Sequence, residues 1–159
     1  MSKFIDRLNK LSRGEAQSIG FTARQAAFSK PKIQLVARLA AESAEGLTGR
    51  IGGADAAVLG ISKSASGAEA MRKLSQSLPD IIWGGWLESG GGAEIKQLAK
   101  AGCDFVVFSA SNTPVTIMKD DKETGKILEL EASITEGLLR TANELPIDAV
   151  LVAGAAKEI

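Results

Sequence analysis

Short apolar segments alternate with amphipathic segments along most of this chain, from about Ile33 to its C-terminus. Each apolar segment has the length of a strand, and the segments between them have the spacing of helices with one apolar face. Strands that alternate with helices form a parallel sheet covered by helices, so the pattern predicts an α/β fold. The predicted strands are Ile33–Ala37, Ala56–Ile61, Ile81–Leu87, Phe105–Phe108, Ile127–Leu130 and Ala149–Ala153.

The predicted strands are apolar along nearly their whole length rather than at every second position. Strands of this kind are buried on both faces, as in a parallel barrel or a doubly wound sheet. Two features favour the barrel-type arrangement. The strand–helix units follow one another without a long excursion, and a helix over Ser2–Leu11, with Ser2 as its N-cap, would close the bottom of the barrel with its apolar face. An open doubly wound sheet is the alternative.

Capping residues mark the starts of two further helices. The segments Ser66–Glu69 and Ser133–Glu136 both have the Ser-x-x-Glu pattern of a capping box. A third helix is expected over Ala93–Ala101, and a weak one near Ser43–Ile51, where glycines lower helix propensity. The segment Val115–Leu130 is predicted either as a short helix followed by a strand or as a hairpin.

Two segments carry the same kind of junction between a helix and a strand. Residues 99–108 read Ala-Lys-Ala-Gly-Cys-Asp-Phe-Val-Val-Phe, and Leu145–Val152 looks like a second copy in which Asp148 precedes the strand. These units resemble those of the TIM-barrel (β/α)8 superfamily, over roughly residues 31–153. A complete barrel of that superfamily has eight strands, typically in about 250 residues. The resemblance therefore implies an incomplete barrel: the front part of a longer protein, one of two chains that complete each other, or an open sheet.

Length and composition describe one ordinary domain, with an N-terminal helix and connector over residues 1–30 and the strand–helix units over 31–159. The formal net charge is zero, which argues against nucleic-acid binding, and no apolar run is long enough for a transmembrane segment. The single cysteine, Cys103, cannot form an internal disulfide, so we expect a cytoplasmic location. Because the chain has no histidine, any acid–base chemistry would use carboxylates, lysines or the thiol.

Ligands of parallel α/β sheets bind at the carboxyl ends of the strands, and this rule selects the candidate site residues. Lys63, Glu88 and Glu131 are the candidates for catalysis, because a desolvated lysine can act as a nucleophile or base and a carboxylate as a general base. Each of the three also fits a solvated surface residue. The candidates for ligand binding are Arg38, Trp86, Gly90, Gly91, Gly92, Ser109 and Asn112.

The binding candidates differ in what they would contact. Arg38 would bind an anion, and Trp86 would line a pocket because it faces the opposite side of its strand from Trp83, which is expected in the core. The glycines at 90–92 lie between a strand and a helix, where backbone N–H groups can hold a phosphate; a loop that lets the helix pack closely also explains them. No metal site is assigned from the sequence, and no cofactor is identified.

The sequence therefore predicts a TIM-barrel-like domain that binds a small anionic metabolite at the carboxyl ends of its strands. One alternative is a non-catalytic domain that is completed by self-association into a homo-oligomer or by a partner. Another is a truncated enzyme without activity. Whether the protein is an enzyme is left open.

Overall fold

A computed structural model describes residues 1–13, 33–40, 51–62, 64–88, 91–111 and 123–154 of the chain. In these residues six strands form one sheet, in which all neighbours run parallel and the spatial order follows the sequence. The strands are β1 (Val36–Leu39), β2 (Ala56–Ile61), β3 (Ile82–Leu87), β4 (Phe105–Ser109), β5 (Gly125–Glu131) and β6 (Ala149–Ala153). The helices are α1 (Lys3–Arg13), α2 (Ser64–Ser77), α3 (Gly92–Lys100) and α4 (Glu136–Glu144). The predicted α/β class with parallel strands is confirmed.

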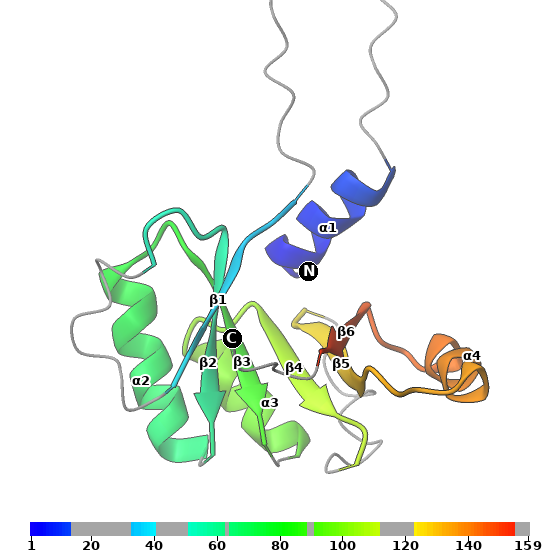
Figure 1. Cartoon of the computed structure of the whole chain (residues 1–159). Helices are drawn as coiled ribbons and strands as arrows, with labels where there is room; N and C mark the ends of the chain where they lie inside the picture. Colours follow the sequence, from blue (N-terminus) through cyan, green and yellow to red (C-terminus); the bar gives the residue numbers. More distant parts are fainter. Residues whose placement is uncertain (14–32, 41–50, 63, 89–90, 112–122, 155–159) are drawn as a thin grey trace, which may run out of the picture.

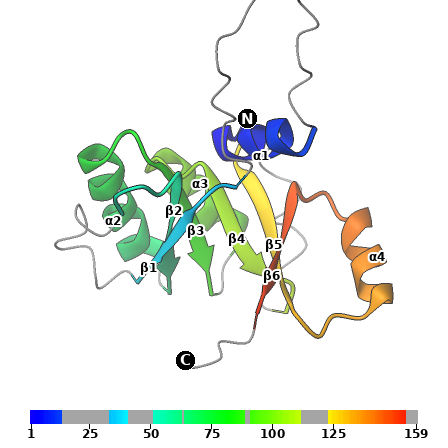
Figure 2. The same cartoon turned by 45° about the horizontal axis from the view of Figure 1, so that its top comes forward.

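The sheet curls into an open half-barrel (Figure 1). The helices α2, α3 and α4 cover its convex side, whereas α1 lies at the end where the strands begin (Figure 2). Within the described residues the strand order never reverses, so the sheet lacks the switch point of a doubly wound fold. The barrel-type prediction with an N-terminal capping helix is therefore confirmed, and the doubly wound alternative is wrong.

Alternation along the strands divides the apolar side chains between the two sides of the sheet. On β3, Trp83 packs outward among the helices and Trp86 faces the inside of the half-barrel, as their spacing predicts. The convex cluster is the larger of the two and joins the sheet to α2, α3 and α4. Cys103 is buried in this cluster, as predicted, and burial raises the pKa of its thiol to about 12.

The concave side is closed at its N-terminal end by α1. Phe4 stacks on Phe105 of β4 with ring centroids 4.5 Å apart, and Ile5 and Leu8 pack into the same cluster. The hydroxyl oxygen of Ser2 accepts a hydrogen bond from the Ile5 N–H at 3.2 Å, so the predicted N-cap is confirmed. The amphipathic N-terminal segment is thus helical because its apolar face has the inside of the half-barrel to pack against.

Two glycines let the concave face accept these large side chains. A Cβ atom on Gly84 would lie 2.4 Å from the ring of Phe105, and one on Gly125 would lie 2.6 Å from the side chain of Ile5. Such contacts are shorter than packed carbon atoms allow. Both positions therefore need glycine if Phe105 and α1 are to keep their places.

An aspartate precedes β2, β4 and β6 and fixes the start of each strand. The backbone N–H groups of Asp55, Asp104 and Asp148 donate to carbonyl groups at the start of the preceding strand, at distances between 2.8 and 2.9 Å. The carboxylates of Asp55 and Asp148 also accept the N–H groups of Leu35 and Lys126, at 2.9 and 2.8 Å. Each of these two aspartates thus bonds twice to the neighbouring strand, which sets the register there.

The carboxylate of Asp104 has a different partner, the N-terminus of α1. It accepts hydrogen bonds from the Ser2 hydroxyl at 2.6 Å and from the backbone N–H groups of Lys3 and Phe4, both at 2.9 Å. A negative charge at a helix N-terminus satisfies free N–H groups and interacts favourably with the helix dipole. Asp104 therefore anchors α1 to the sheet.

Several boundaries differ from the sequence-based predictions. β1 begins at Val36 rather than Ile33, because its partner β2 begins at Ala56 and the ladder can start only there. α2 begins at Ser64, three residues before the start that an N-cap at Ser66 predicts, and α4 has Thr135 as its N-cap, two residues after the predicted Ser133. The weak helix predicted near Ser43–Ile51 falls outside the described residues except for Ile51, and residues 112–122 also lie outside them. The hairpin alternative for Val115–Leu130 requires a free edge on β5. β5 pairs with β4 on one side and with β6 on the other, which leaves it no hairpin partner.

Candidate functional site

A cavity of about 390 Å³ lies inside the half-barrel, between the concave face of the sheet and α1; we call it the inner cavity. Among the described residues that line it, most side chains are apolar, and Gln34 and Arg38 are the polar exceptions. The apolar lining residues are Phe4, Leu8, Leu11, Val36, Val58, Trp86, Phe105, Val107, Ile127, Ala149, Val150 and Leu151. Its size and apolar character are typical of small-molecule sites.

Arg38 and Trp86 meet on the concave face near the carboxyl ends of their strands. The guanidinium carbon of Arg38 lies 4.0 Å from the ring centroid of Trp86, which is the geometry of a cation–π contact. Arg38 is on β1 and Trp86 on β3, so the arginine side chain must cross β2. The residue of β2 that pairs with Trp86 is Gly60, and the residue that pairs with Arg38 is Val58. The structure thus unites two of the predicted binding residues.

The guanidinium keeps its hydrogen-bonding capacity while it lies on the indole ring. Stacking uses the face of the planar group, whereas its N–H donors lie along the edge. Arg38 forms no ion pair with any other residue in the described part of the chain. The inner cavity therefore offers an uncompensated positive charge beside an apolar lining.

Gln34 is the second polar group of the inner cavity and was not predicted from the sequence. Its side-chain oxygen Oε1 is inaccessible to solvent and has no hydrogen-bond partner in the described part of the chain. A buried acceptor without a partner is unfavourable and uncommon in proteins. The available signal was its position four residues before Arg38, which places the two side chains on the same side of an extended segment.

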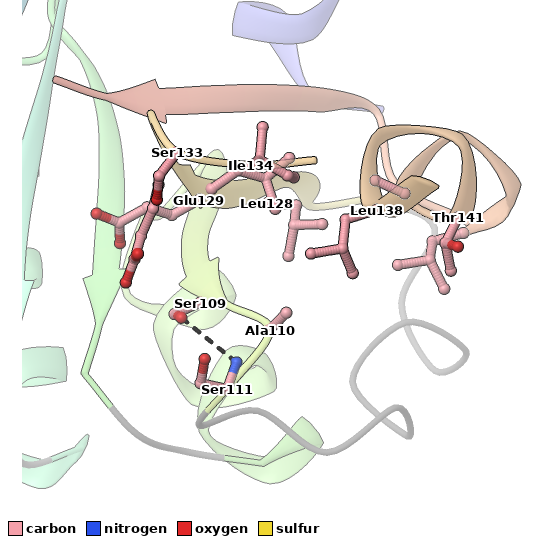
Figure 3. Close-up of a pocket in the computed structure, with 13 residues that line it drawn as sticks. Ser109, Ala110, Ser111, Leu128, Glu129, Ser133, Ile134, Leu138 and Thr141 are labelled. Atoms are coloured by element: carbon pink, nitrogen blue, oxygen red, sulfur yellow. Dashed lines mark hydrogen bonds between the residues drawn. The ribbon is translucent and has the colours of Figure 1, made fainter. Parts of the chain in front are cut away.

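A different cavity of about 420 Å³ lies between the carboxyl ends of β4 and β5 and helix α4; we call it the outer cavity. It contains two more predicted residues, Ser109 and Glu131, together with Glu129. Figure 3 shows Glu129 and Ser133 on one side of this cavity and the apolar side chains Leu128 and Leu138 on another. Among the described residues that line this cavity there is no lysine or arginine, and two carboxylates are present. The described lining residues therefore disfavour an anion, and they do not join Arg38.

The remaining sequence-based candidates that the structure describes do not line either cavity. Glu88 is exposed, and its backbone N–H donates to the carbonyl of Ile61 at 3.4 Å. The Gly91 N–H donates to the Glu94 carboxylate at 2.6 Å, so the start of α3 already holds a negative group where a phosphate was expected. Gly92 is the first residue of α3. Lys63, Gly90 and Asn112 lie outside the described residues.

Metal and thiol chemistry find no support in the described part of the chain. No group of three or more cysteine, aspartate or glutamate side chains is placed to hold a metal ion among the residues that the structure describes. The Cys103 thiol, with its pKa raised to about 12 by burial, remains protonated at neutral pH and cannot serve as a nucleophile. The inner cavity, with Arg38 as its charged residue among the described lining residues, is the candidate that remains.

Comparison with known proteins adds no assignment. No family model matches this chain, and no curated protein shows significant similarity to its sequence. Among the described residues, no helix has the length and apolar character that crossing a membrane requires.

Proposed function

We propose that the protein binds a small anionic metabolite in the inner cavity, near the carboxyl ends of its strands. The observation that carries the proposal is the Arg38 guanidinium, held 4.0 Å from the Trp86 ring centroid at an apolar cavity. Arg38 and Trp86 lie toward the carboxyl ends of their strands, where barrel-type α/β proteins bind ligands, whereas α1 and the first residues of β1, β4 and β6 line the opposite end of the cavity. The proposal concerns binding and assigns no reaction; the suggested roles of Lys63, Glu88 and Glu131 in proton transfer stay predictions.

Arg38 and the cavity wall would act on different parts of the ligand. A carboxylate, sulfonate or phosphate would accept paired hydrogen bonds from the edge of the guanidinium. Trp86 restrains the arginine, so less conformational freedom is lost when the anion binds. The apolar body of the ligand would then be buried against side chains such as Val58 and Leu151. The site thus favours an amphipathic anion over a purely polar one.

Two matched dyes test this proposal. The probe 8-anilinonaphthalene-1-sulfonate has an aromatic body and one anionic group, and N-phenyl-1-naphthylamine has the same aromatic body without the charge. We expect Arg38→Gln to weaken sulfonate binding by about tenfold, as loss of one charge-assisted contact implies. Binding of the uncharged dye should stay nearly unchanged, because the apolar lining is intact.

The control variant is Arg72→Gln, which removes an exposed arginine of α2 on the other side of the sheet. It should bind both dyes as the wild type does. If Arg38→Gln and Arg72→Gln bind the sulfonate equally well, Arg38 does not form an anion site and the proposal is wrong.

A second candidate function, self-association, is favoured by the two edges of the sheet. β1 and β6 are the edge strands, and near them Ile33, Leu35 and Val152 are 71%, 61% and 55% exposed. Because β1 and β6 run in the same direction, β6 of one copy could pair with β1 of a second copy and continue the parallel sheet. Exposed apolar side chains at unpaired edges are typical of association surfaces.

Sedimentation velocity at micromolar concentration tests self-association. We expect a dimer or larger species in the wild type and a monomer after Val152→Lys, because a charge at this edge opposes strand pairing. Lys73→Ala on α2, a residue with an exposed side chain, is the control and should leave the assembly intact. A wild-type protein that sediments as a monomer at every concentration would exclude this candidate.

A further inference from the structure

The inner cavity has a positive charge toward one end and the apolar face of α1 at the other. We infer that its ligand is a single-chain carboxylate, a fatty acid, whose head group binds Arg38 and whose tail ends against α1. This inference rests on the proposed function and adds the chemical class of the ligand and the element that limits its length. Its basis is the lining of the cavity, its volume and the anchoring of α1.

The first step is the distribution of polarity along the cavity. Arg38 is the charged residue among the described lining residues, and it lies on Trp86 toward the carboxyl ends of the strands. From there to α1 the described wall consists of aliphatic and aromatic side chains such as Val58 and Val107, with Gln34 as the exception. The Gln34 oxygen is inaccessible to solvent, so it offers a ligand no acceptor. Polar groups along the body of a ligand would lose water here without gaining partners from the apolar wall, so a plain hydrocarbon body suits it.

The second step is the size of the cavity. Its volume is about 390 Å³, near the lower limit of the roughly 300–1,000 Å³ that small-molecule sites enclose. A space of this size suits one hydrocarbon chain better than the two chains of a diacyl lipid. The guanidinium of Arg38 matches one carboxylate, which can accept two parallel hydrogen bonds from it. The ligand is therefore a monocarboxylate with one chain.

The third step is the closed end of the cavity. Phe4, Leu8 and Leu11 line the cavity from α1, where their i, i+4, i+7 spacing places them on one face of the helix. Phe4 also stacks on Phe105 with ring centroids 4.5 Å apart, and the Asp104 carboxylate accepts three hydrogen bonds from the N-terminus of α1. The helix is thus a fixed apolar wall, and a tail that reaches it can extend no further.

Leu8 is the residue of α1 that sets this limit. It is half-buried, lines the inner cavity and packs against the apolar side chains of the concave face. Phe4 is held by its stacking on Phe105, so shortening Leu8 moves the wall back without disturbing that pair. Leu8 thus determines the specificity for chain length.

A series of fatty acids tests the inference on the full chain. Isothermal titration below the micelle concentration measures the affinity of octanoate, decanoate, dodecanoate and tetradecanoate. Each buried CH₂ should tighten binding about fourfold, and in the wild type we expect this gain to end before tetradecanoate, because the tail then meets α1. Leu8→Ala should tighten tetradecanoate by at least about fourfold and leave octanoate nearly unchanged. The matched control Leu139→Ala, at an exposed residue of α4, should bind the whole series as the wild type does.

The outcomes separate the inference from the proposed function. A gain that continues to tetradecanoate in the wild type, or an end of the gain that Leu8→Ala does not move, overturns the role of α1. If no fatty acid binds although the sulfonate dye binds through Arg38, the ligand class is wrong and the anion site stands. If Arg38→Gln changes the affinity of neither the dye nor any acid, the proposed function itself fails.

A folding defect in the variant does not remove the test. Leu8→Val shortens the side chain by less, so it replaces Leu8→Ala if that variant fails to fold. The wild-type series needs no substitution, and an uninterrupted gain along it is sufficient to reject the inference.

Discussion

Replacing Asp104 by alanine should release α1 from the half-barrel. The Asp104 carboxylate accepts three hydrogen bonds from the N-terminus of α1, given by the Ser2 hydroxyl and the backbone N–H groups of Lys3 and Phe4. No other described residue bonds these two N–H groups, because they belong to the first turn of the helix. The substitution would leave them, together with the Ser2 hydroxyl, to water.

The expected loss follows from the number and the setting of these bonds. A hydrogen bond to a charged group contributes about 1.5–3 kcal/mol when it is buried, but Lys3 is exposed and water compensates part of its bond. We therefore expect Asp104→Ala to lower the free energy of unfolding by about 3 kcal/mol, which exceeds the roughly 0.5–2 kcal/mol of a single N-cap loss because three bonds are removed. Asp148→Ala, which removes one carboxylate bond to Lys126, should cost only about 1 kcal/mol.

Urea unfolding followed by circular dichroism measures the loss, and hydrogen exchange of the α1 amides locates it. In Asp104→Ala the amides of α1 should lose protection before those of β2 and β3, because the sheet keeps its convex helices. Asp104→Asn retains an acceptor oxygen without the charge and should lie between the wild type and the alanine variant. An Asp104→Ala protein within about 0.5 kcal/mol of the wild type, the range of ordinary surface changes, would refute the proposed anchoring.

Three further outcomes are expected from the packing and the thiol. Gly84→Ala should lower the free energy of unfolding in urea by about 1–3 kcal/mol, because its Cβ would overlap the Phe105 ring. The control Gly137→Ala, in the exposed first turn of α4, should be neutral or stabilise the protein by up to about 1 kcal/mol. Equal effects of the two substitutions would contradict the packing of Phe105 on Gly84. The Cys103 pKa rises from 9.0 to about 12 on folding, so its contribution to stability is complete below pH 9 and is lost between pH 9 and 12. By pH 10 the wild type should have lost about 1.4 kcal/mol more than Cys103→Val, and parallel curves would exclude the burial of the thiol. Alkylation of native Cys103 at pH 8 should proceed only as fast as the protein unfolds, which a rate independent of urea would contradict.

The parts of the fold that could be predicted are those that depend on local pattern. β2 and β6 match their predicted ranges, because each is a short apolar run that begins directly after an aspartate. β1 was displaced because its start depends on the residue of β2 with which it pairs, and such pairing is not visible in one segment. The capping boxes were misplaced because more than one Ser or Thr lies before or within the first turn of each helix, at 64 and 66 and at 133 and 135, and the local pattern does not decide where the helix begins.

From the sequence, the candidate site could be predicted only as a set of residues at the carboxyl ends of the strands, without the contacts between them. The rule for carboxyl ends selected Arg38 and Trp86 separately, but their contact joins β1 to β3 across β2 and depends on the order and curl of the sheet. The same rule selected Ser109 and Glu131, which line the other cavity because they end β4 and β5 beside α4. Asp104 was missed because its partners lie about a hundred residues away in the sequence, where no local motif connects them.

The most direct test of the central claim is a nuclear Overhauser measurement between Arg38 and Trp86 in the free protein. With the guanidinium carbon 4.0 Å from the ring centroid, the account predicts cross-peaks between the arginine side-chain protons and the indole protons, and an upfield ring-current shift of the arginine δ protons. Arginine resonances at ordinary shifts, with no cross-peak to the indole of Trp86, would contradict the arrangement of the sheet and the anion site that depends on it.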